Sequence, residues 1–509
     1  MLESSPPLGE LEGASFMFDI DWQRVIEALQ YDANSPMIFS SGIFLFLFLG
    51  FSMIYCLLGK TTTLRLLFVT AFSYYFYYKS SGFYFFLLAV VTVSDFIIAR
   101  KIHQLQPKED EPDFTRKKRR QLLVLSLVVD LGLLAYFKYT NFFGEMWAEL
   151  TGGDFSPWNI FLPVGISFFT FQSLSYTIDV YRGQLKPLRS LLDYAFYVSF
   201  FPQLVAGPIV RARDFIPQIR RPLCVSEQML ARGVFLILAG LIKKAIISDY
   251  ISVNFVERVF DQPDLYSGVE NLMAVYGYAL QIYCDFSGYS DMAIGIALLL
   301  GFEFPKNFDS PYKSRSITEF WHRWHISLSS WLKDYLYISM GGNRKGKIRQ
   351  YFNLLVTMLL GGLWHGASLN FVLWGGMHGL VLIFDKLTKK IQEYIPRVIG
   401  VIITFHFVCL AWIFFRAESF DKAFLMIQQI GENFQPQIFL QWVESYWAVG
   451  FLMLIGYVMH FMPSRITMST ERNITRMPLV VKAMLIVIVV FVVVQIKSSE
   501  VQPFIYFQF

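Results

Sequence analysis

The sequence predicts an all-α protein that crosses a membrane many times. Hydrophobic residues make up 55% of the 509 residues and charged residues only 16%, whereas about a quarter of a typical soluble domain is charged. The mean hydropathy is +0.44. The hydrophobic runs are long and continuous, which indicates membrane helices and not the alternating strands of a membrane barrel.

The N-terminal residues 1–36 are expected to form a polar extension in front of the membrane domain. They contain no basic segment followed directly by a hydrophobic core, so the sequence predicts no cleavable signal peptide. Ile20, Val25, Ile26 and Leu29 recur at helical spacing, which is typical of an amphipathic helix lying on the membrane surface. A partly ordered tail is the alternative for this segment.

Hydrophobic segments follow along the rest of the chain, and several reach the roughly 20 residues that a spanning helix needs. We expect about ten to thirteen transmembrane or re-entrant helices, with the short segment 351–363 re-entrant or tilted. Pro202, Gly207 and Pro208 interrupt one segment, and such a break at membrane depth is expected to be buried or to line a cavity. The alternative is an ordinary helix end at the membrane surface. The segments are 38–58, 62–78, 82–99, 121–137, 158–180, 191–206, 228–250, 269–301, 351–363, 368–385, 397–415, 446–462 and 478–497.

Basic residues are concentrated in the loops between these segments. The net charge is +5, and the segment 100–121 is especially rich in lysine and arginine. Such loops face the cytoplasm, so we place this one there. The basic segments 211–221 and 306–349 are placed on the same side or serve an anionic ligand, and the modest net charge does not indicate nucleic acid. The four cysteines include no C-x-x-C pair, so neither a disulfide framework nor a zinc site is expected.

One stretch, residues 281–380, concentrates the side chains that can carry chemistry. Four of the seven histidines lie in it among many aromatic residues, and ionisable residues at membrane depth usually mark function. Within it, Thr318–Ser339 is predicted to be one amphipathic helix, because its apolar residues step by three and four. On that helix His325 lies at the edge of the apolar face and should face a pocket, whereas His322 should face solvent or lipid headgroups. The apolar residues are Trp321, Trp324, Leu328, Trp331, Tyr335 and Ile338.

A second histidine, His365, lies in an apolar run with glycines on both sides. Gly361, Gly362 and Gly366 allow close backbone approach and a break in the helix. A desolvated imidazole stays neutral, and a neutral imidazole is suited to act as a general base. The alternative is a histidine that only bonds a neighbouring helix.

Five strings of the sequence are distinctive, and together they resemble the membrane-bound O-acyltransferase family, in particular its bacterial alginate-acetylating branch. They are Ile282–Ala293, Phe304–Phe308, Trp321–His325, Gly362–Gly366 and Phe414–Ala417, and Phe161–Phe168 and Gly207-Pro208 fit the same branch. The resemblance runs from residue 37 to the C-terminus. We therefore expect one acyltransferase domain, residues 37–509, behind the extension 1–36.

The resemblance implies a rim of tilted helices around a thinner core, with a central tunnel from the cytosol to the exterior. His365 matches the catalytic histidine of the family, and His325 matches a second, supporting histidine. We expect polar and aromatic residues of the same stretch to line the tunnel or bind substrate. These residues are Asp285, Ser287, Asn307, Trp321, Trp324, Ser327 and Trp364.

The expected activity is O-acyl transfer in the bacterial inner membrane. The acyl group, expected to be acetyl, would come from a cytosolic thioester such as acetyl-CoA. It would go to a hydroxyl of an extracytoplasmic polysaccharide, or to a periplasmic partner transferase. A thioester is already activated, so the enzyme must chiefly position two substrates and remove one proton. No metal and no permanently bound cofactor are expected.

Two alternatives remain open at this point. The nearest is D-alanyl transfer from a carrier protein to teichoic acid. The other is a transporter or flippase, which Asp95, Asp130 and the broken helices would suit, although bonding between helices is the favoured role of these two aspartates. Inverted repeats would favour transport, and the sequence shows none.

Overall fold

The computed structural model describes residues 21–33, 36–105 and 113–496, and every regular element in these ranges is helical. The predicted all-α class is confirmed. The helices of the first half are α1 (Trp22–Leu29), α2 (Gly42–Leu57), α3 (Thr62–Ser81), α4 (Phe85–Gln104), α5 (Asp113–Thr151), α6 (Ile166–Tyr181), α7 (Leu191–Ser199), α8 (Phe201–Leu204), α9 (Ala212–Ile219), α10 (Glu227–Leu241), α11 (Asp249–Ile251) and α12 (Glu257–Asp261).

The second half begins with the long helix α13. Its helices are α13 (Gly268–Leu299), α14 (Ile317–Arg323), α15 (Ile326–Trp331), α16 (Lys347–His365), α17 (Leu369–Leu387), α18 (Lys389–Gln392), α19 (Arg397–Arg416), α20 (Phe420–Glu432), α21 (Ile438–Ser445), α22 (Trp447–Phe461), α23 (Ser464–Arg476) and α24 (Leu479–Ile496). Short 3₁₀ turns are η1 (Gly82–Tyr84), η4 (Pro263–Leu265) and η5 (Pro311–Lys313), and wider π-helical turns are η2 (Ile242–Ser248), η3 (Ser252–Val256) and η6 (Leu332–Tyr337).

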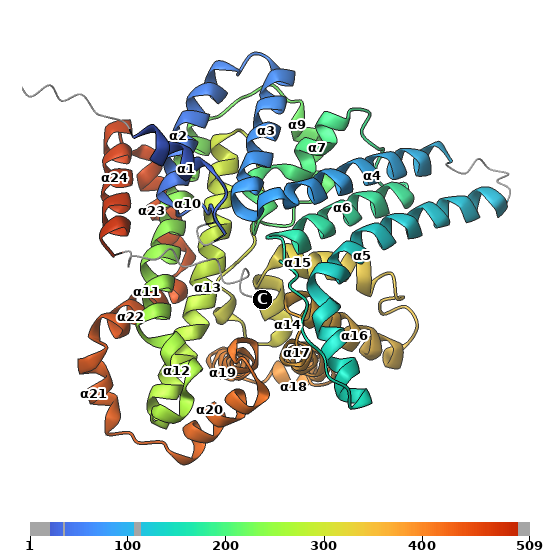
Figure 1. The fold of residues 1–509 in the computed structure, drawn as a ribbon. Helices are drawn as coiled ribbons and strands as arrows, with labels where there is room; N and C mark the ends of the chain where they lie inside the picture. Colours follow the sequence, from blue (N-terminus) through green and yellow to red (C-terminus); the bar gives the residue numbers. More distant parts are fainter. Residues whose placement is uncertain (1–20, 34–35, 106–112, 497–509) are drawn as a thin grey trace, which may run out of the picture.

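Helix α13 runs through the middle of the molecule, with α10 to α12 on one side and α14 to α17 on the other (Figure 1). It starts with a capping box, in which Ser267 Oγ accepts from the Glu270 N–H and the Glu270 carboxylate accepts from the Ser267 N–H. Almost all of its residues are buried. Helix α10 lies against it so closely that a Cβ at Gly240 would come within 2.5 Å of the Gly288 carbonyl oxygen. Glycine is therefore required where these two helices cross.

Among the residues that the structure describes, three helical stretches are long and apolar enough to cross a membrane, namely Thr62–Gln104, Phe114–Thr151 and Arg397–Arg416. Counting each bent pair as one span, α21–α22 and α23–α24 raise the number to five. The other hydrophobic segments form shorter helices, such as α2, or helices that pack inside the bundle, such as α13. The polytopic class holds, and the expected ten to thirteen segments include many that do not span by themselves.

The part of the N-terminal extension that the structure describes forms α1, whereas Phe16–Ile20 lies outside the described residues. Trp22 is 67% exposed and Ile26 54% exposed, so α1 keeps an uncovered apolar face, as an amphipathic surface helix requires. The C-terminal end of α1 is held by α3, where Lys79 Nζ donates to the Ala28 carbonyl oxygen at 2.9 Å.

The interruption of the helix predicted from Pro202, Gly207 and Pro208 is observed, and it is buried. Helix α7 ends at Ser199, one turn of helix follows as α8, and residues 201–210 are all buried. Gly165, at φ +75°, packs against this break, and a Cβ there would come within 2.7 Å of the Leu204 carbonyl oxygen. The break is therefore internal and not a helix end at the membrane surface.

The prediction of one continuous helix over Thr318–Ser339 is wrong. Helix α14 ends at Arg323, His325 takes a left-handed conformation at φ +40°, and α15 starts at Ile326. The cause is a tertiary partner, because the Ile326 N–H donates to the Asn307 carbonyl oxygen and not to a preceding turn. The amphipathic pattern is local and could not predict this contact with a distant residue. Ile338, placed on the apolar stripe, is 39% exposed.

Candidate active site

His325 is fully buried at the start of α15, and its hydrogen bonds fix which ring nitrogen carries the proton. Its Nδ1 lies 3.3 Å from Asn307 Oδ1. That oxygen also accepts from the N–H and the Oγ of Ser327 at 3.1 and 2.9 Å, while Asn307 Nδ2 donates to Ser290 Oγ. These bonds assign Nδ1 of His325 as a donor. Its Nε2 is then an acceptor, and it has no hydrogen-bond partner within the described ranges.

His365 is the last residue of α16 and is also buried. Helix α5 holds this helix end in place: Lys138 Nζ donates to the carbonyl oxygens of Trp364 and His365 at 2.7 and 2.8 Å. Tyr139 Oη donates to the carbonyl oxygen of Leu363 at 2.8 Å. The last carbonyls of a helix have no partner inside it and favour a cation. Lys138 and Tyr139 therefore cap the turn that carries His365.

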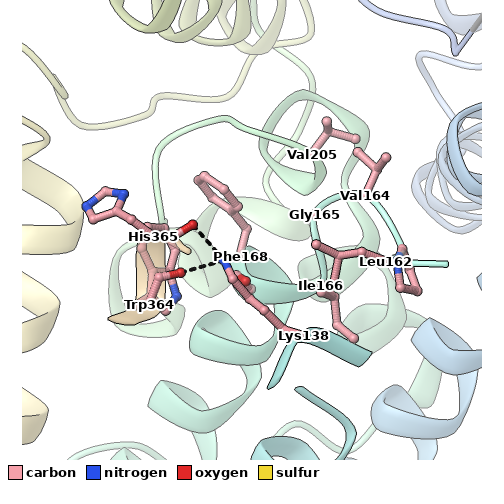
Figure 2. Close-up of a pocket in the computed structure, with 11 residues that line it drawn as sticks. Lys138, Leu162, Val164, Gly165, Ile166, Phe168, Val205, Trp364 and His365 are labelled. Carbon is pink, nitrogen blue, oxygen red and sulfur yellow. Dashed lines mark hydrogen bonds between the residues drawn. The ribbon is translucent and has the colours of Figure 1, made fainter. Parts of the chain in front are cut away.

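A small pocket of about 40 Å³ lies between Lys138 and the end of α16, large enough for a few water molecules (Figure 2). The loop that starts at Leu162 and the first turn of α6, up to Phe168, form its opposite wall. Figure 2 shows the His365 imidazole turned away from Lys138, so this pocket meets the backbone of His365 and not its ring. The ring itself lies 5.1 Å from the ring of Trp374 and 5.4 Å from that of Phe415.

Both histidines lie against one indole ring. Trp364 lies 6.1 Å from His325 and 5.0 Å from His365, measured between ring centres. Phe168 and Phe171 each lie 5.4 Å from the same indole. Burial among aromatic rings disfavours the charged form of an imidazole, so both histidines are held neutral. The structure thus brings together the two histidines that the sequence singled out.

The other residues expected at the site fall into two groups. Asn307 and Ser327 contact His325, and Trp364 contacts both histidines, while Trp324 is fully buried at 5.1 Å from Trp412. Asp285 and Ser287 of α13 form the second group.

On α13, Asp285 forms a buried ion pair with Lys244 of η2 at 2.5 Å, whereas the next residue, Phe286, lies 4.6 Å from the His325 ring. Ser287 is buried, and its Oγ has no hydrogen-bond partner in the described part of the chain. The substrate-binding roles of Asp285 and Ser287 therefore remain predictions.

His322 is exposed, as predicted, although the helical phase used to place it does not apply across the break. It lies on a polar surface where Arg323 pairs with Glu319 at 2.9 Å and with Asp309 at 3.2 Å. The hydrogen bond from Lys306 lowers the pKa of the Asp309 carboxyl. This surface is charged and solvated, in contrast to the ring system around His325.

His378 of α17 is a residue that the sequence reasoning did not select. It is fully buried, its Nδ1 accepts from Trp321 Nε1 at 3.3 Å, and its ring lies 4.8 Å from that of Trp374. The available signal was a histidine inside an apolar helix, four residues after a tryptophan and therefore on the same helix face.

Asp95 of α4 forms hydrogen bonds to neighbouring helices, which is the role that the sequence analysis favoured for it. It accepts from Ser126 of α5 at 2.6 Å and from Ser173 of α6. In the described ranges, no three His, Cys, Asp or Glu side chains are grouped so that they could hold a metal ion.

The sequence pattern of the membrane-bound O-acyltransferase family, MBOAT, matches residues 72–420, which include every residue of the site above. The chain is 41% identical over 400 residues to "Probable alginate O-acetylase AlgI" of Pseudomonas aeruginosa, covering 77% of this chain and 74% of that protein. It is 38% identical over 372 residues to "Peptidoglycan O-acetyltransferase" of Helicobacter pylori, covering 67% and 69%.

A more distant relative is "Teichoic acid D-alanyltransferase" of Bacillus subtilis, 30% identical over 287 residues, or 52% of this chain and 71% of that protein. The match to the family pattern covers more than half of the chain and both histidines. The chain is therefore an O-acyltransferase that belongs to the membrane-bound O-acyltransferase family, in the branch of the alginate O-acetylases.

Proposed function

We propose that this protein transfers an acetyl group from a cytosolic thioester, acetyl-CoA, across the bacterial inner membrane to the hydroxyl of an extracytoplasmic polysaccharide. A periplasmic partner transferase is the alternative immediate acceptor. The names of the relatives at 41% and 38% identity both specify O-acetylation, of alginate and of peptidoglycan. The relative named for D-alanyl transfer shares 30% identity over about half of this chain. Acetyl is therefore the better supported acyl group.

The observation that carries the proposal is the pair of buried histidines that both contact Trp364. In the proposed reaction, the acceptor oxygen attacks the carbonyl carbon of the thioester, so that a C–O bond forms and the C–S bond breaks. The imidazole of His365 takes the hydroxyl proton as general base and returns it to the leaving sulfur. The unprotonated Nε2 of His325 accepts a hydrogen bond from a substrate and so orients that substrate.

A cluster of arginines supports the placement of the donor, within which Arg211 is buried and paired with Asp334. Arg182 and Arg211 both lie 5.3 Å from the centre of the Tyr335 ring. Arg119, at the basic N-terminal end of α5, donates to the Tyr181 carbonyl oxygen at 2.8 Å and so belongs to the same end of the bundle. Arginine pairs well with phosphate, and CoA carries phosphate groups. This end is the proposed cytosolic mouth.

The test is consumption of acyl thioesters by the purified protein in lipid nanodiscs. Acetyl-CoA should be consumed when a polysaccharide acceptor or the partner transferase is present, and label from the acetyl group should appear on the acceptor. Consumption of a D-alanyl carrier thioester alone would replace acetylation with D-alanylation. Failure to consume any acyl thioester, with uptake of a solute or lipid instead, would contradict the enzymatic proposal.

A further inference from the structure

Two buried hydrogen-bond donors on α17 have no acceptor among the residues that the structure describes. Trp374 and His378 are each 0% exposed, and neither Trp374 Nε1 nor His378 Nε2 has a hydrogen-bond partner in the described part of the molecule. An indole nitrogen can only donate. His378 accepts from Trp321 at Nδ1, so its neutral ring carries the proton on Nε2. Both atoms are therefore N–H donors, and an unpaired buried donor requires an explanation.

These donors lie beside the proposed general base. The Trp374 ring is 5.1 Å from the His365 ring and nearly perpendicular to it, and the His378 ring is 4.8 Å from the Trp374 ring. Figure 2 shows that the His365 ring points away from the water-sized pocket at Lys138, which leaves it on the side of these aromatic rings.

Aromatic rings surround the two donors. Trp374 contacts Phe415 at 5.1 Å and Trp412 at 5.8 Å, and His378 contacts Phe407 at 5.4 Å. Trp412 differs from Trp374 in one respect, because its Nε1 donates to Tyr312 Oη at 3.3 Å. Trp374 and His378 thus hold a pair of unsatisfied donors, whereas the adjacent tryptophan is satisfied.

We infer that Trp374 Nε1–H and His378 Nε2–H bind the carbonyl oxygen of the acyl group and stabilise it as it becomes an oxyanion. This inference rests on the proposed acyl transfer. When the acceptor oxygen attacks, the C=O electron pair moves onto the carbonyl oxygen, and it returns as the C–S bond breaks. The hydroxyl proton passes by way of His365 to the sulfur. Trp374 and His378 keep their protons and remain neutral, so no charged group is buried. Donors aimed at developing negative charge in a dry site are among the largest contributors to catalysis.

A structural role for His378, limited to holding Trp321, makes a different prediction. In His378→Asn the amide lies near the position of Nδ1, so the contact with Trp321 can be kept while the free donor is lost. In His378→Gln the amide reaches the position of Nε2, so the free donor is kept. An oxyanion role therefore requires Gln to be the better replacement, and a purely structural role requires Asn.

The experiment measures kcat and KM for acetyl-CoA with purified wild-type protein, Trp374→Phe, His378→Asn and His378→Gln. Trp412→Phe is the matched control, because it removes the same ring volume from the same cluster but no unpaired donor. Trp374→Phe and His378→Asn should lower kcat by about a hundredfold with little change in KM. His378→Gln should keep several times the kcat of His378→Asn. Trp412→Phe should lose less than Trp374→Phe.

Replacing Trp374 by the benzothienyl isostere, which has sulfur in place of N–H, keeps the ring and removes only the donor. It should reproduce the loss in kcat if Trp374→Phe does not fold. Equal kcat for the isostere and the wild type, or a better His378→Asn than His378→Gln, would overturn the oxyanion assignment while leaving acyl transfer intact. A wild-type protein that consumes no acyl thioester would instead contradict the proposed function, and the inference would fall with it.

Discussion

At the scale of single residues, Asn307 organises the site although it is a neutral amide in a loop. Its carbonyl oxygen accepts a hydrogen bond from the Ile326 N–H. Its side-chain Oδ1 accepts from the Ser327 N–H and from His325 Nδ1. These bonds break the helix, hold His325 at positive φ and select its tautomer. The sequence nominated Asn307 and His325 together, but it could not show that one holds the other, because they are separated by α14 along the chain.

Asn307→Ala should therefore damage both stability and activity. It leaves the Ser327 N–H buried without an acceptor, which costs about 1–3 kcal/mol, and it frees the His325 ring to change tautomer. We expect a lower melting temperature and a loss of kcat larger than that loss of stability explains. Ser290→Ala, which removes only the partner of Asn307 Nδ2, is the control. Equal behaviour of the two variants would argue against this role.

At the scale of elements, the sequence predicted those helices whose pattern is local. The segment 269–301 is observed as α13 from Gly268 to Leu299. The segment 121–137 is observed as the much longer α5, Asp113–Thr151, because hydropathy detects only the apolar middle of a helix with charged and aromatic ends. Lys138 lay just outside the predicted segment, so its role at the end of α16 could not be anticipated.

The cap on α16 gives a prediction about Lys138. Lys138→Met keeps most of the side-chain volume but leaves two carbonyls at the end of the helix without a donor, next to His365. It should lower kcat by about tenfold or more, because misplacing a catalytic group is costly. Tyr139→Phe removes the hydrogen bond to the carbonyl oxygen of Leu363. This carbonyl lies two residues before His365, so the variant should lower kcat less. A larger effect of Tyr139→Phe would contradict this account.

The crossing of α10 and α13 gives a prediction about glycine. In Gly240→Ala the new Cβ would lie 2.5 Å from the Gly288 carbonyl oxygen, so the two helices must separate. The yield of folded protein after detergent extraction should fall sharply. Gly132→Ala is the matched control in α5, where nothing lies within 4 Å of the new Cβ, and alanine is the better helix former there. Loss of folding in both variants would point to a general sensitivity of the membrane helices.

At the scale of the whole molecule, the class and the family were predicted correctly from the sequence, but His378 was not selected. His322, His325 and His365 stand in distinctive strings, whereas His378 lies in an ordinary apolar helix. Its position beside Trp374 and Trp321 depends on the packing of α14 against α17. Local patterns cannot report such a contact.

The orientation in the membrane is tested by a reporter. The basic segment from Lys108 to Arg120 should be cytoplasmic, because positively charged loops are retained on that side. A phosphatase and green fluorescent protein reporter pair inserted there should give fluorescence and no phosphatase activity. The opposite pattern would reverse the orientation, and with it the side on which the thioester binds.

The most direct measurement of the central claim is acyl thioester consumption by purified His365→Ala, with His322→Ala as the matched control. His365 is buried at the end of α16, and His322 is exposed on the charged surface. Both variants should insert and fold. His365→Ala should lose about a hundredfold or more in rate, and His322→Ala should stay close to wild type. A His365→Ala protein that keeps more than about a tenth of the wild-type rate would contradict the general-base role.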